Sequence, residues 1–490
     1  MAALIRALSS IALVGLAACA GQAVVLMALY LRHRRDPSPH RPALAEDDLP
    51  MVTVQIPLRN ERHVASQVIC AAAALDWPRD RLEIQVLDDS DDETSEVVAG
   101  EVAAIRQDGL DIIVLRRPVP VGFKAGALAE GLAQAKGEHL AVFDADFCPP
   151  PDFLHQTVPH LVTDPTLGFV QVRWTHLNSA YSLMTRVQTL ALDAHFTVEH
   201  IARNRSGLLM NANGSAVVWR GEAIGAAGGW SAETMTEDLD LSYRMQLSGW
   251  RALYLPDVVA PAELTPLMVA FKAQQQRWAK GAIQSLRKLA GPILRSPRLN
   301  VGQKAMAILH LSGYLNQPLL LAMVVLTLPM VLTDAHLADF GLWLGALAWV
   351  PPALYLLGQA HLHRDWPRRF FAYPALMLLW LGMAWSLTLG LVDGALHWGG
   401  TFVRTPKYRI RGRSGRWQAS SYRPAVGLTW VGELVLGAYV CVAIWLALAR
   451  GQAHLVSLVG GYAAGQMMVL GLTLVQALKA GRDRDRVLGE

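Results

Sequence analysis

The sequence has 490 residues, a hydrophobic fraction of 52%, a charged fraction of 17% and a net charge of +4. This length exceeds that of one ordinary compact domain, so we expect two or more structural regions. The apolar excess is typical of membrane proteins. Lys and Arg residues cluster at the ends of apolar runs, as membrane orientation requires, and this pattern disfavours nucleic-acid binding.

The first apolar run covers about residues 11–31 and is followed by a basic cluster at 32–35. About 20 apolar residues are enough to cross a bilayer. Residues 16–19, Leu-Ala-Ala-Cys, are also similar to a lipoprotein cleavage box, but the apolar run continues past Cys19. Because the basic cluster follows the run, we expect residues 1–35 to be an uncleaved transmembrane anchor with the next segment in the cytosol.

Residues 50–290 predict a soluble, doubly wound α/β domain. Short runs rich in β-branched residues alternate with amphipathic stretches. The expected strands cover 52–56, 83–87, 112–115 and 139–143, and the expected helices include 62–74 and 125–135. This alternation predicts a parallel sheet covered by helices on both faces. Ligands bind just beyond the carboxyl ends of the strands in such sheets.

The last block is mostly membrane, in regions 300–397 and 425–480. Its apolar runs cover about 309–333, 340–360, 370–392, 426–449 and 455–478. Two basic loops, 361–369 and 398–424, are both expected in the cytosol. A single crossing between them would place them on opposite sides, so we expect 370–392 to lie in the interface or inside the bundle without crossing. The anchor and the other four runs then cross, with the N-terminus outside and the basic tail 479–486 inside.

Acidic pairs follow two of the predicted strands. Asp88 and Asp89 end the second strand, and Asp144 and Asp146 follow the fourth. Asp is common in loops and caps, so one such pair is weak evidence by itself. A carboxylate pair at the end of a buried strand favours a bound cation, because burying unpaired charge is costly. Mg²⁺ or Mn²⁺, held by one or two carboxylates and by phosphate oxygens, is usual in nucleotide enzymes.

Two further motifs follow in the same domain. Residues 236–238 read Thr-Glu-Asp, and residues 274–278 read Gln-Gln-Gln-Arg-Trp shortly before the membrane block. Thr236 is equally compatible with a helix N-cap whose following acids favour the helix dipole. Arg277 can bind a diphosphate through two hydrogen bonds. The ring face of Trp278 can stack on a sugar.

The order of these motifs resembles that of family 2 glycosyltransferases of the cellulose synthase and plant mannan synthase type, whose hallmark is a spaced D, DxD, TED and Q(Q/R)xRW. The resemblance covers about residues 50–424 and extends beyond the four motifs. The further similar stretches are Val54 to Pro57 with Asn60 and Glu61, Gly122 to Leu128, Asn213 to Ser215, and Phe402 to Lys407. The last stretch resembles the gating loop of cellulose synthases, so residues 398–424 are expected to form a cytosolic, gating-like loop.

The resemblance implies a GT-A-like nucleotide-sugar-binding domain inserted in an α-helical transmembrane bundle, with a role for each matching position. Asp238, next to Glu237, would be the general base, and a single displacement would invert the anomeric configuration. Asp144 and Asp146 would hold Mg²⁺ or Mn²⁺. The substrate-binding residues would be Asp88, Asp89, Lys124, Asp144, Gln274, Gln275, Arg277, Trp278, Thr405 and Lys407. Two departures stand out: Arg404 replaces a Val of cellulose synthases, and residues 118–121 lack the usual Arg before Lys124.

The resemblance predicts a hexosyltransferase that uses UDP-glucose or GDP-mannose to extend a β-glycan. The crossings and the gating-like loop favour a processive synthase that exports its product. The alternative is a single-addition enzyme acting on a membrane lipid, similar to ceramide glucosyltransferases. A transporter or receptor with a degenerate domain is disfavoured because every acidic motif is intact. The expected partners are a nucleotide-sugar donor, a glycan acceptor, membrane lipid and an accessory export subunit. The expected location is the inner (plasma) membrane, multi-pass, with the catalytic domain in the cytosol.

Overall fold

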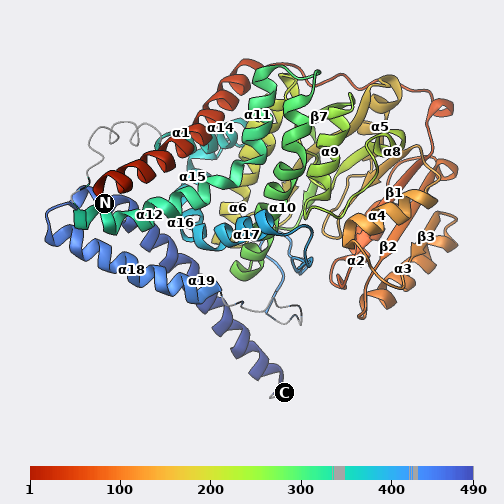
Figure 1. The fold of residues 1–490 in the computed structure, drawn as a ribbon. Helices are drawn as coiled ribbons and strands as arrows, with labels where there is room; N and C mark the ends of the chain where they lie inside the picture. Colours follow the sequence, from red (N-terminus) through yellow and green to blue (C-terminus); the bar gives the residue numbers. More distant parts are fainter. Residues whose placement is uncertain are drawn as a thin grey trace.

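The structure is a computed structural model, and it describes residues 1–333, 335, 348–418, 420, 422, 427 and 429–488. Figure 1 shows the strands at one end of the molecule and the long apolar helices at the other, where the N-terminus also lies. The α/β domain and the membrane block expected from the sequence are thus both present.

A seven-stranded sheet forms the core of the domain, in the order β3-β2-β1-β4-β6-β5-β7. Its strands are β1 (Val52–Leu58), β2 (Leu82–Asp88), β3 (Asp111–Leu115), β4 (His139–Val142), β5 (Leu167–His176), β6 (Val217–Arg220) and β7 (Arg251–Ala262). β1 to β4 run parallel, which confirms the predicted strands. β6 runs antiparallel to both of its neighbours, so the expectation of a parallel sheet is corrected at this strand.

The reversal at β6 follows from where the chain enters it. Val217, the first residue of β6, pairs with Val142, the last residue of β4. The Ala216 N–H also donates to the Val142 carbonyl. A strand that enters at the carboxyl end of β4 can only run back along it. Residues 213–215 therefore lie at the same edge of the sheet as the segment that follows β4.

Helices cover both faces of the sheet, as predicted. One apolar core joins the sheet to α2, α3 and α5, and a second joins its other face to α4, α7, α8, α9 and the end of α1. The bounds are α1 (Ala2–His33), α2 (Ala65–Ala73), α3 (Thr94–Gln107), α4 (Phe123–Gln134), α5 (Phe153–Thr163), α7 (His200–Arg205), α8 (Gly221–Ala226) and α9 (Glu237–Leu247). The end of the first apolar helix thus packs against the catalytic domain.

In the described part of the chain, four helices are long and apolar enough to cross a membrane, or up to five if one bent pair counts as a span. The four are Ala2–His33, Gly313–Thr333, Thr429–Ala449 and Val459–Lys479. They coincide with apolar runs seen in the sequence, and the chain is a multi-pass membrane protein. The helices after the sheet are α10 (Met268–Arg295), α11 (Val301–Leu311), α12 (Asn316–Thr333), α14 (Val350–Leu362), α15 (Trp366–Phe370), α16 (Tyr373–Gly382), α17 (Ala384–Leu396), α18 (Thr429–Ala449) and α19 (Val456–Leu488).

Two of the predicted apolar runs differ from simple spans. The run 340–360 lies partly outside the described residues, and its described end belongs to α14. The run 370–392 is bent by 49° at the break between Gly382 and Ala384. α17, on one side of this bend, packs along α10, the helix that carries residues 274–278. That the bent segment does not cross the membrane stays a prediction.

Two glycines allow α17 to lie against α10. A Cβ on Gly390 would lie 2.9 Å from the Gln276 carbonyl oxygen, and one on Gly394 would lie 2.6 Å from that of Lys280. Small residues four positions apart permit such close helix contact. We expect Gly394→Ala to lower the free energy of unfolding by about 1–3 kcal/mol, because it overpacks this contact. The matched control is Gly437→Ala in α18, where a Cβ meets nothing within 4 Å. Thermal unfolding in detergent checks this, and equal effects of the two substitutions would contradict it.

Candidate active site

The acidic motifs lie together at one edge of the sheet. β2 ends at Asp88, and Asp144 and Asp146 follow the end of β4. β2 and β4 lie on either side of β1 and run parallel to it, so their carboxyl ends share an edge. This is the edge where ligands bind in open α/β sheets.

Asp88 and Asp89 are each paired with an arginine that sequence reasoning missed. Asp88 is buried and accepts from Arg116 Nε at 3.0 Å. Arg117 Nε donates to Asp89 Oδ1 at 3.0 Å, and its Nη2 donates to the other oxygen at 2.5 Å. The sequence signal that could have revealed these partners is the pair of arginines directly after β3, the strand that lies next to β2. Both carboxylates are therefore neutralised before any donor arrives.

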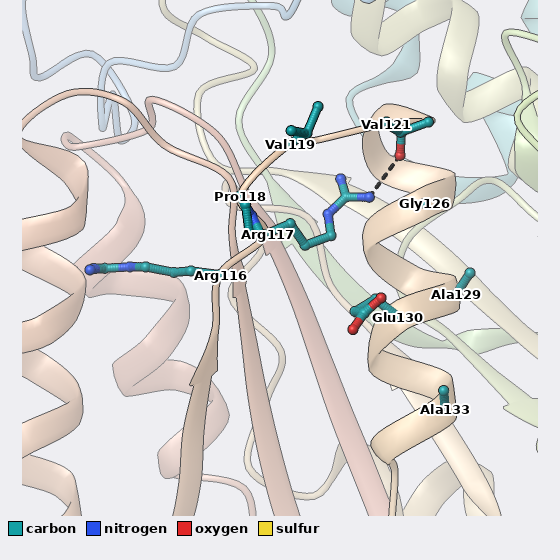
Figure 2. Close-up of a pocket in the computed structure, with 9 residues that line it drawn as sticks. All are labelled: Arg116, Arg117, Pro118, Val119, Val121, Gly126, Ala129, Glu130 and Ala133. Carbon is teal, nitrogen blue, oxygen red and sulfur yellow. Dashed lines mark hydrogen bonds between the residues drawn. The ribbon is translucent and has the colours of Figure 1, made fainter.

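Arg117 also shapes the turn that begins α4. Its guanidinium donates to the carbonyls of Val121 at 2.7 Å and Phe123 at 2.9 Å. Figure 2 shows the Arg117 guanidinium donating to the Val121 carbonyl. Both residues line a groove of about 490 Å³. The Arg that the family carries before Lys124 is missing here, but Arg117 reaches this turn from just upstream. It thereby ties Asp89 to the helix that carries Lys124.

Lys124 joins three motifs. Its Nζ donates to Asp144 Oδ1 at 2.6 Å and to the Gly214 carbonyl at 2.7 Å. Glu237 Oε1 lies 3.6 Å from the same nitrogen. Burial alone would lower the pKa of Lys124, but the charges of Asp144 and Glu237 raise it above its ordinary value. The ammonium therefore stays charged between the three motifs.

Asp238 lies on the first turn of α9, against Gly214. A Cβ on Gly214 would lie 3.0 Å from Asp238 Oδ2, and the backbone there has φ +73°, so only glycine fits. Burial, and then the charge of Glu237, raise the pKa of Asp238 to about 7, while Lys124 opposes the shift. A carboxyl with a pKa near the working pH is suited to general base catalysis.

The structure also tests the alternative that residues 236–238 form a helix N-cap. Thr236 does occupy the N-cap position of α9, but its side chain makes no capping hydrogen bond within the described residues. The acids Glu237 and Asp238 do lie in the first turn of α9, where they favour the helix dipole.

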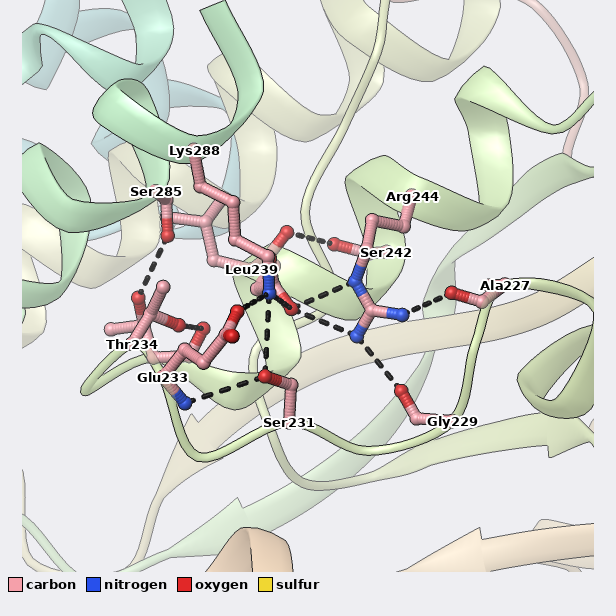
Figure 3. A network of polar contacts seen from close by, with 12 residues as sticks. Ala227, Gly229, Ser231, Glu233, Thr234, Leu239, Ser242, Arg244, Ser285 and Lys288 are labelled. Carbon is pink, nitrogen blue, oxygen red and sulfur yellow. Dashed lines mark hydrogen bonds and ion pairs between the residues drawn. The ribbon is translucent and has the colours of Figure 1, made fainter. Parts of the chain in front are cut away.

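A polar network holds α9 against α10, and sequence reasoning did not single it out. Asp240, two residues after Asp238, is fully buried and accepts from Arg244 Nε at 2.8 Å and from Lys288 at 3.2 Å. Figure 3 shows Arg244 also donating to the loop before α9, where it reaches the Gly229 carbonyl at 2.8 Å. Lys288 belongs to α10, so this network fixes the helix of Asp238 relative to the helix of Arg277.

The Gln-Gln-Gln-Arg-Trp motif lies on α10, and its side chains contact different parts of the molecule. Arg277 donates to the Val403 carbonyl at 3.1 Å. Its pKa is lowered by burial, which the nearby charges of Glu237, Asp144 and Asp238 partly offset. Gln275 is buried and accepts from the Tyr314 hydroxyl at 2.9 Å, so it contacts the membrane part. Gln274 and Trp278 are half-buried.

The gating-like loop is docked on the site. Phe402 stacks on Phe123, with ring centroids 6.1 Å apart, and lies 4.2 Å from the Arg277 guanidinium. Thr405 is buried. Lys407 Nζ donates to Asp146 Oδ2 and to the Glu263 carbonyl, both at 2.7 Å. These contacts bring Arg277 and Lys407 to the edge of the sheet. The end of the predicted loop, from 419, lies partly outside the described residues.

The arginine that departs from the family pattern also has partners. Arg404 Nη1 lies 3.4 Å from Glu61 Oε2, and its guanidinium lies 4.0 Å over the ring of Tyr422. Burial raises the pKa of Glu61 to about 8, although Arg404 opposes the shift. Arg404 therefore links the loop to the segment after β1.

Asp144 and Asp146 fit a divalent cation that arrives with a diphosphate. Each already accepts from an ammonium group, Asp144 from Lys124 and Asp146 from Lys407. Asp146 is buried, so its charge requires a positive neighbour. Within the described residues, no group of three or more His, Cys, Asp or Glu side chains converges as a metal site. Phosphate oxygens would therefore have to complete the ligand set of Mg²⁺ or Mn²⁺.

Comparisons with known proteins agree with this geometry. Residues 50–281 match the family model described as glycosyltransferase like family 2. Glucomannan 4-beta-mannosyltransferase 7 of Arabidopsis thaliana is 40% identical over 292 residues, which cover 57% of this chain and 52% of that protein. Glucomannan 4-beta-mannosyltransferase 1 of Oryza sativa subsp. japonica is 42% identical over 278 residues, 56% of this chain and 53% of that protein. The chain spans about half the length of these curated relatives.

A solved structure shares the fold. The mannosyltransferase PcManGT from Pyrobaculum calidifontis, solved with GDP-Man and Mn²⁺, aligns with a TM-score of 0.55 and 22% identity, over 79% of this chain and 98% of that one. At this identity the likeness shows the fold alone, a GT-A-like mixed sheet. Residues 50–281, which contain the sheet and the four motifs, are therefore similar to the glycosyltransferases of family 2.

Proposed function

We propose that this protein is a membrane-embedded, inverting mannosyltransferase that adds mannose from GDP-mannose to a growing β-1,4-linked glycan. The observation that carries the activity is the Asp238 carboxyl, whose pKa is raised to about 7, between Gly214 and the charged groups of Lys124 and Glu237. The choice of mannose over glucose is supported by the relatives at about 40% identity, which are named as glucomannan mannosyltransferases.

The reaction is a single displacement at the anomeric carbon. Asp238 takes the proton from the acceptor hydroxyl while the hydroxyl oxygen forms a bond to that carbon. The bond from the anomeric carbon to the diphosphate oxygen breaks on the opposite side, so the configuration inverts. Lys124 and Arg277 hold the negative charge of the departing diphosphate. Arg277 lies near Asp144 and Asp238, so it can reach a diphosphate bound at this edge.

The remaining site residues bind and orient. Mg²⁺ or Mn²⁺ held by Asp144 and Asp146 would neutralise charge on the leaving group. Asp88 and Asp89 would contact the nucleoside, and Gln274, Gln275 and Trp278 would contact the acceptor. Thr405 and Lys407 of the docked loop would exclude water from the bound donor. The catalytic domain adjoins the apolar helices, and this position supports processive addition with export of the product. The catalytic domain would lie on the cytosolic side of the inner (plasma) membrane. Membrane lipid and an accessory export subunit are the proposed partners.

The pH dependence of the reaction follows from Asp238. The base must be ionised, and its pKa is raised to about 7, so activity is lost as the pH falls through this value. We expect kcat/KM to fall about tenfold per pH unit below 7 and to level off above it. Initial rates at low donor concentration, from about pH 5.5 to 8.5, check this. A rate that does not change across pH 7 would contradict the role of Asp238.

The experiment that tests the function is incorporation of labelled sugar by membranes that contain the protein. GDP-mannose and UDP-glucose are offered separately, with Mn²⁺ or with a chelator. Long product from GDP-mannose that β-mannanase digests supports the proposal. Long product from UDP-glucose alone would reassign the sugar. Label confined to an extractable lipid would instead favour the single-addition enzyme.

A further inference from the structure

A chain of four polar side chains lies behind the Asn-Gly-Ser turn, outside the four motifs. Glu199 Oε2 lies 2.9 Å from His195 Nδ1. His195 Nε2 lies 3.0 Å from Asn213 Nδ2. The other side of the same amide, Asn213 Oδ1, lies 2.6 Å from His200 Nε2. The Asn213 side chain is therefore held between two imidazole rings.

An unusual backbone turn brings these two rings together. Residues His195–Glu199 form a π-helix, η3, between α6 (Leu183–Ala194) and α7. The His200 N–H donates to the His195 carbonyl, five residues back, and the two ring centroids lie 4.4 Å apart. In an α-helix, residues five apart point to different sides. π-helical turns are rare and occur frequently at functional sites.

The protons of this chain can be placed from its chemistry. Glu199 is an acceptor: burial opposes its charge, but the hydrogen bond from His195 lowers its pKa overall. His195 therefore carries its proton on Nδ1, and its bare Nε2 accepts from the Asn213 amide. Burial lowers the pKa of His200 well below its ordinary value. His200 Nδ1 is buried without a hydrogen-bond partner among the described residues, so its single proton belongs on Nε2 and is donated to Asn213.

The Asn213 side chain is adjacent in the sequence to the residue that contacts Lys124 and Asp238. Asn213 precedes Gly214, whose carbonyl accepts from Lys124 at 2.7 Å. A Cβ on Gly214 would lie 3.0 Å from Asp238 Oδ2, so this glycine leaves room for the carboxylate. The Asn213 backbone N–H donates to Gln171 Oε1 at 2.9 Å, so its main chain is held from β5 as well. Without its side-chain partners, Asn213 would keep only the main-chain bond to Gln171, and Gly214 would gain freedom to move relative to both charged groups.

We propose that His195 and His200 are positioning residues for the transfer reaction, which act through Asn213 to hold Gly214 between Lys124 and Asp238. This inference rests on the proposed function, because it concerns the alignment of the same base. None of these four side chains is proposed to touch substrate. Its effect is on the geometry in which Asp238 meets the acceptor hydroxyl.

Two substitutions of His195 separate this role from a structural one. The asparagine side chain extends as far as the Nδ1 position of histidine, so His195→Asn keeps the hydrogen bond to Glu199 and loses the one to Asn213. The glutamine side chain extends as far as the Nε2 position of histidine, so His195→Gln keeps the hydrogen bond to Asn213 and loses the one to Glu199. His195→Gln leaves Glu199 buried with one partner fewer and is expected to be the less stable protein. Positioning through Asn213 predicts that it is nevertheless the more active one.

The experiment measures kcat, donor KM and thermal unfolding of the wild type and both variants, purified in detergent, with GDP-mannose as donor. We expect His195→Asn to lower kcat about 100-fold, the cost of a small misplacement. Its donor KM should change little, because Lys124 keeps its bond to Asp144. His195→Gln should retain most of kcat. Equal kcat values, or a slower His195→Gln, would overturn the inference. A wild type inactive with both GDP-mannose and UDP-glucose would instead overturn the proposed function.

Discussion

Replacing Asp238 with Asn is expected to lower turnover by about 10³-fold while the protein still binds GDP. Asn has the shape of Asp but cannot accept a proton, and general base catalysis contributes about 10² to 10⁴ in rate. The donor should still bind, because Lys124 and Arg277 keep their charges. The measurement is the initial rate of labelled mannose incorporation, together with calorimetric binding of GDP to the purified protein.

The matched control for this substitution is Asp108→Asn. Asp108 follows α3, is exposed and lies outside the site, so the same chemical change there should leave the rate unaltered. A variant Asp238→Asn that loses GDP binding, or that keeps more than about a tenth of the turnover, would show that Asp238 is not the base.

Replacing Asp146 with Asn is expected to remove the effect of Mn²⁺ on donor binding. The amide can still accept from Lys407 and from the Glu263 N–H, which contact Asp146 at 2.7 and 3.1 Å. It lacks the charge that a divalent cation requires, and loss of a metal contact costs about 10- to 100-fold in affinity. In Mn²⁺, the Kd for GDP-mannose should therefore rise to the value that the wild type shows with a chelator.

The comparison variant is Lys407→Ala, which removes the ammonium group that donates to Asp146. This variant keeps the Asp146 carboxylate and should keep the response of donor binding to Mn²⁺. Persistent Mn²⁺ stimulation in Asp146→Asn would contradict the metal assignment. Loss of that stimulation in Lys407→Ala would show that the loop, rather than the carboxylate, carries the metal dependence.

Much of this molecule could be predicted from the sequence because the evidence is local. The strands at 52–58 and 82–88 carry apolar residues at alternate positions, and a short window of sequence shows this pattern. The acids after these strands lie at one edge because parallel strands end together. Long apolar runs similarly indicate membrane helices by length alone.

Other features depend on contacts between distant segments, which leave no local pattern. Lys407 reaches Asp146 across 261 positions of sequence. The pairing of Asp89 with Arg117 depends on β3 lying beside β2. The direction of β6 follows from where the chain enters it, and nothing in its four residues states this.

The arrangement around the base shows this division most clearly. The Thr-Glu-Asp motif identifies Asp238 in the sequence, but the raised pKa of Asp238 arises from its burial and from the charge of Glu237 after folding. His195 and His200 look like ordinary helix residues until a π-helical turn brings both rings to Asn213. The family resemblance, the first four strands and the candidate acids of the site could therefore be read from local sequence. The tertiary structure alone decided how those acids are charged and held, because charge and alignment depend on neighbours that only folding brings together.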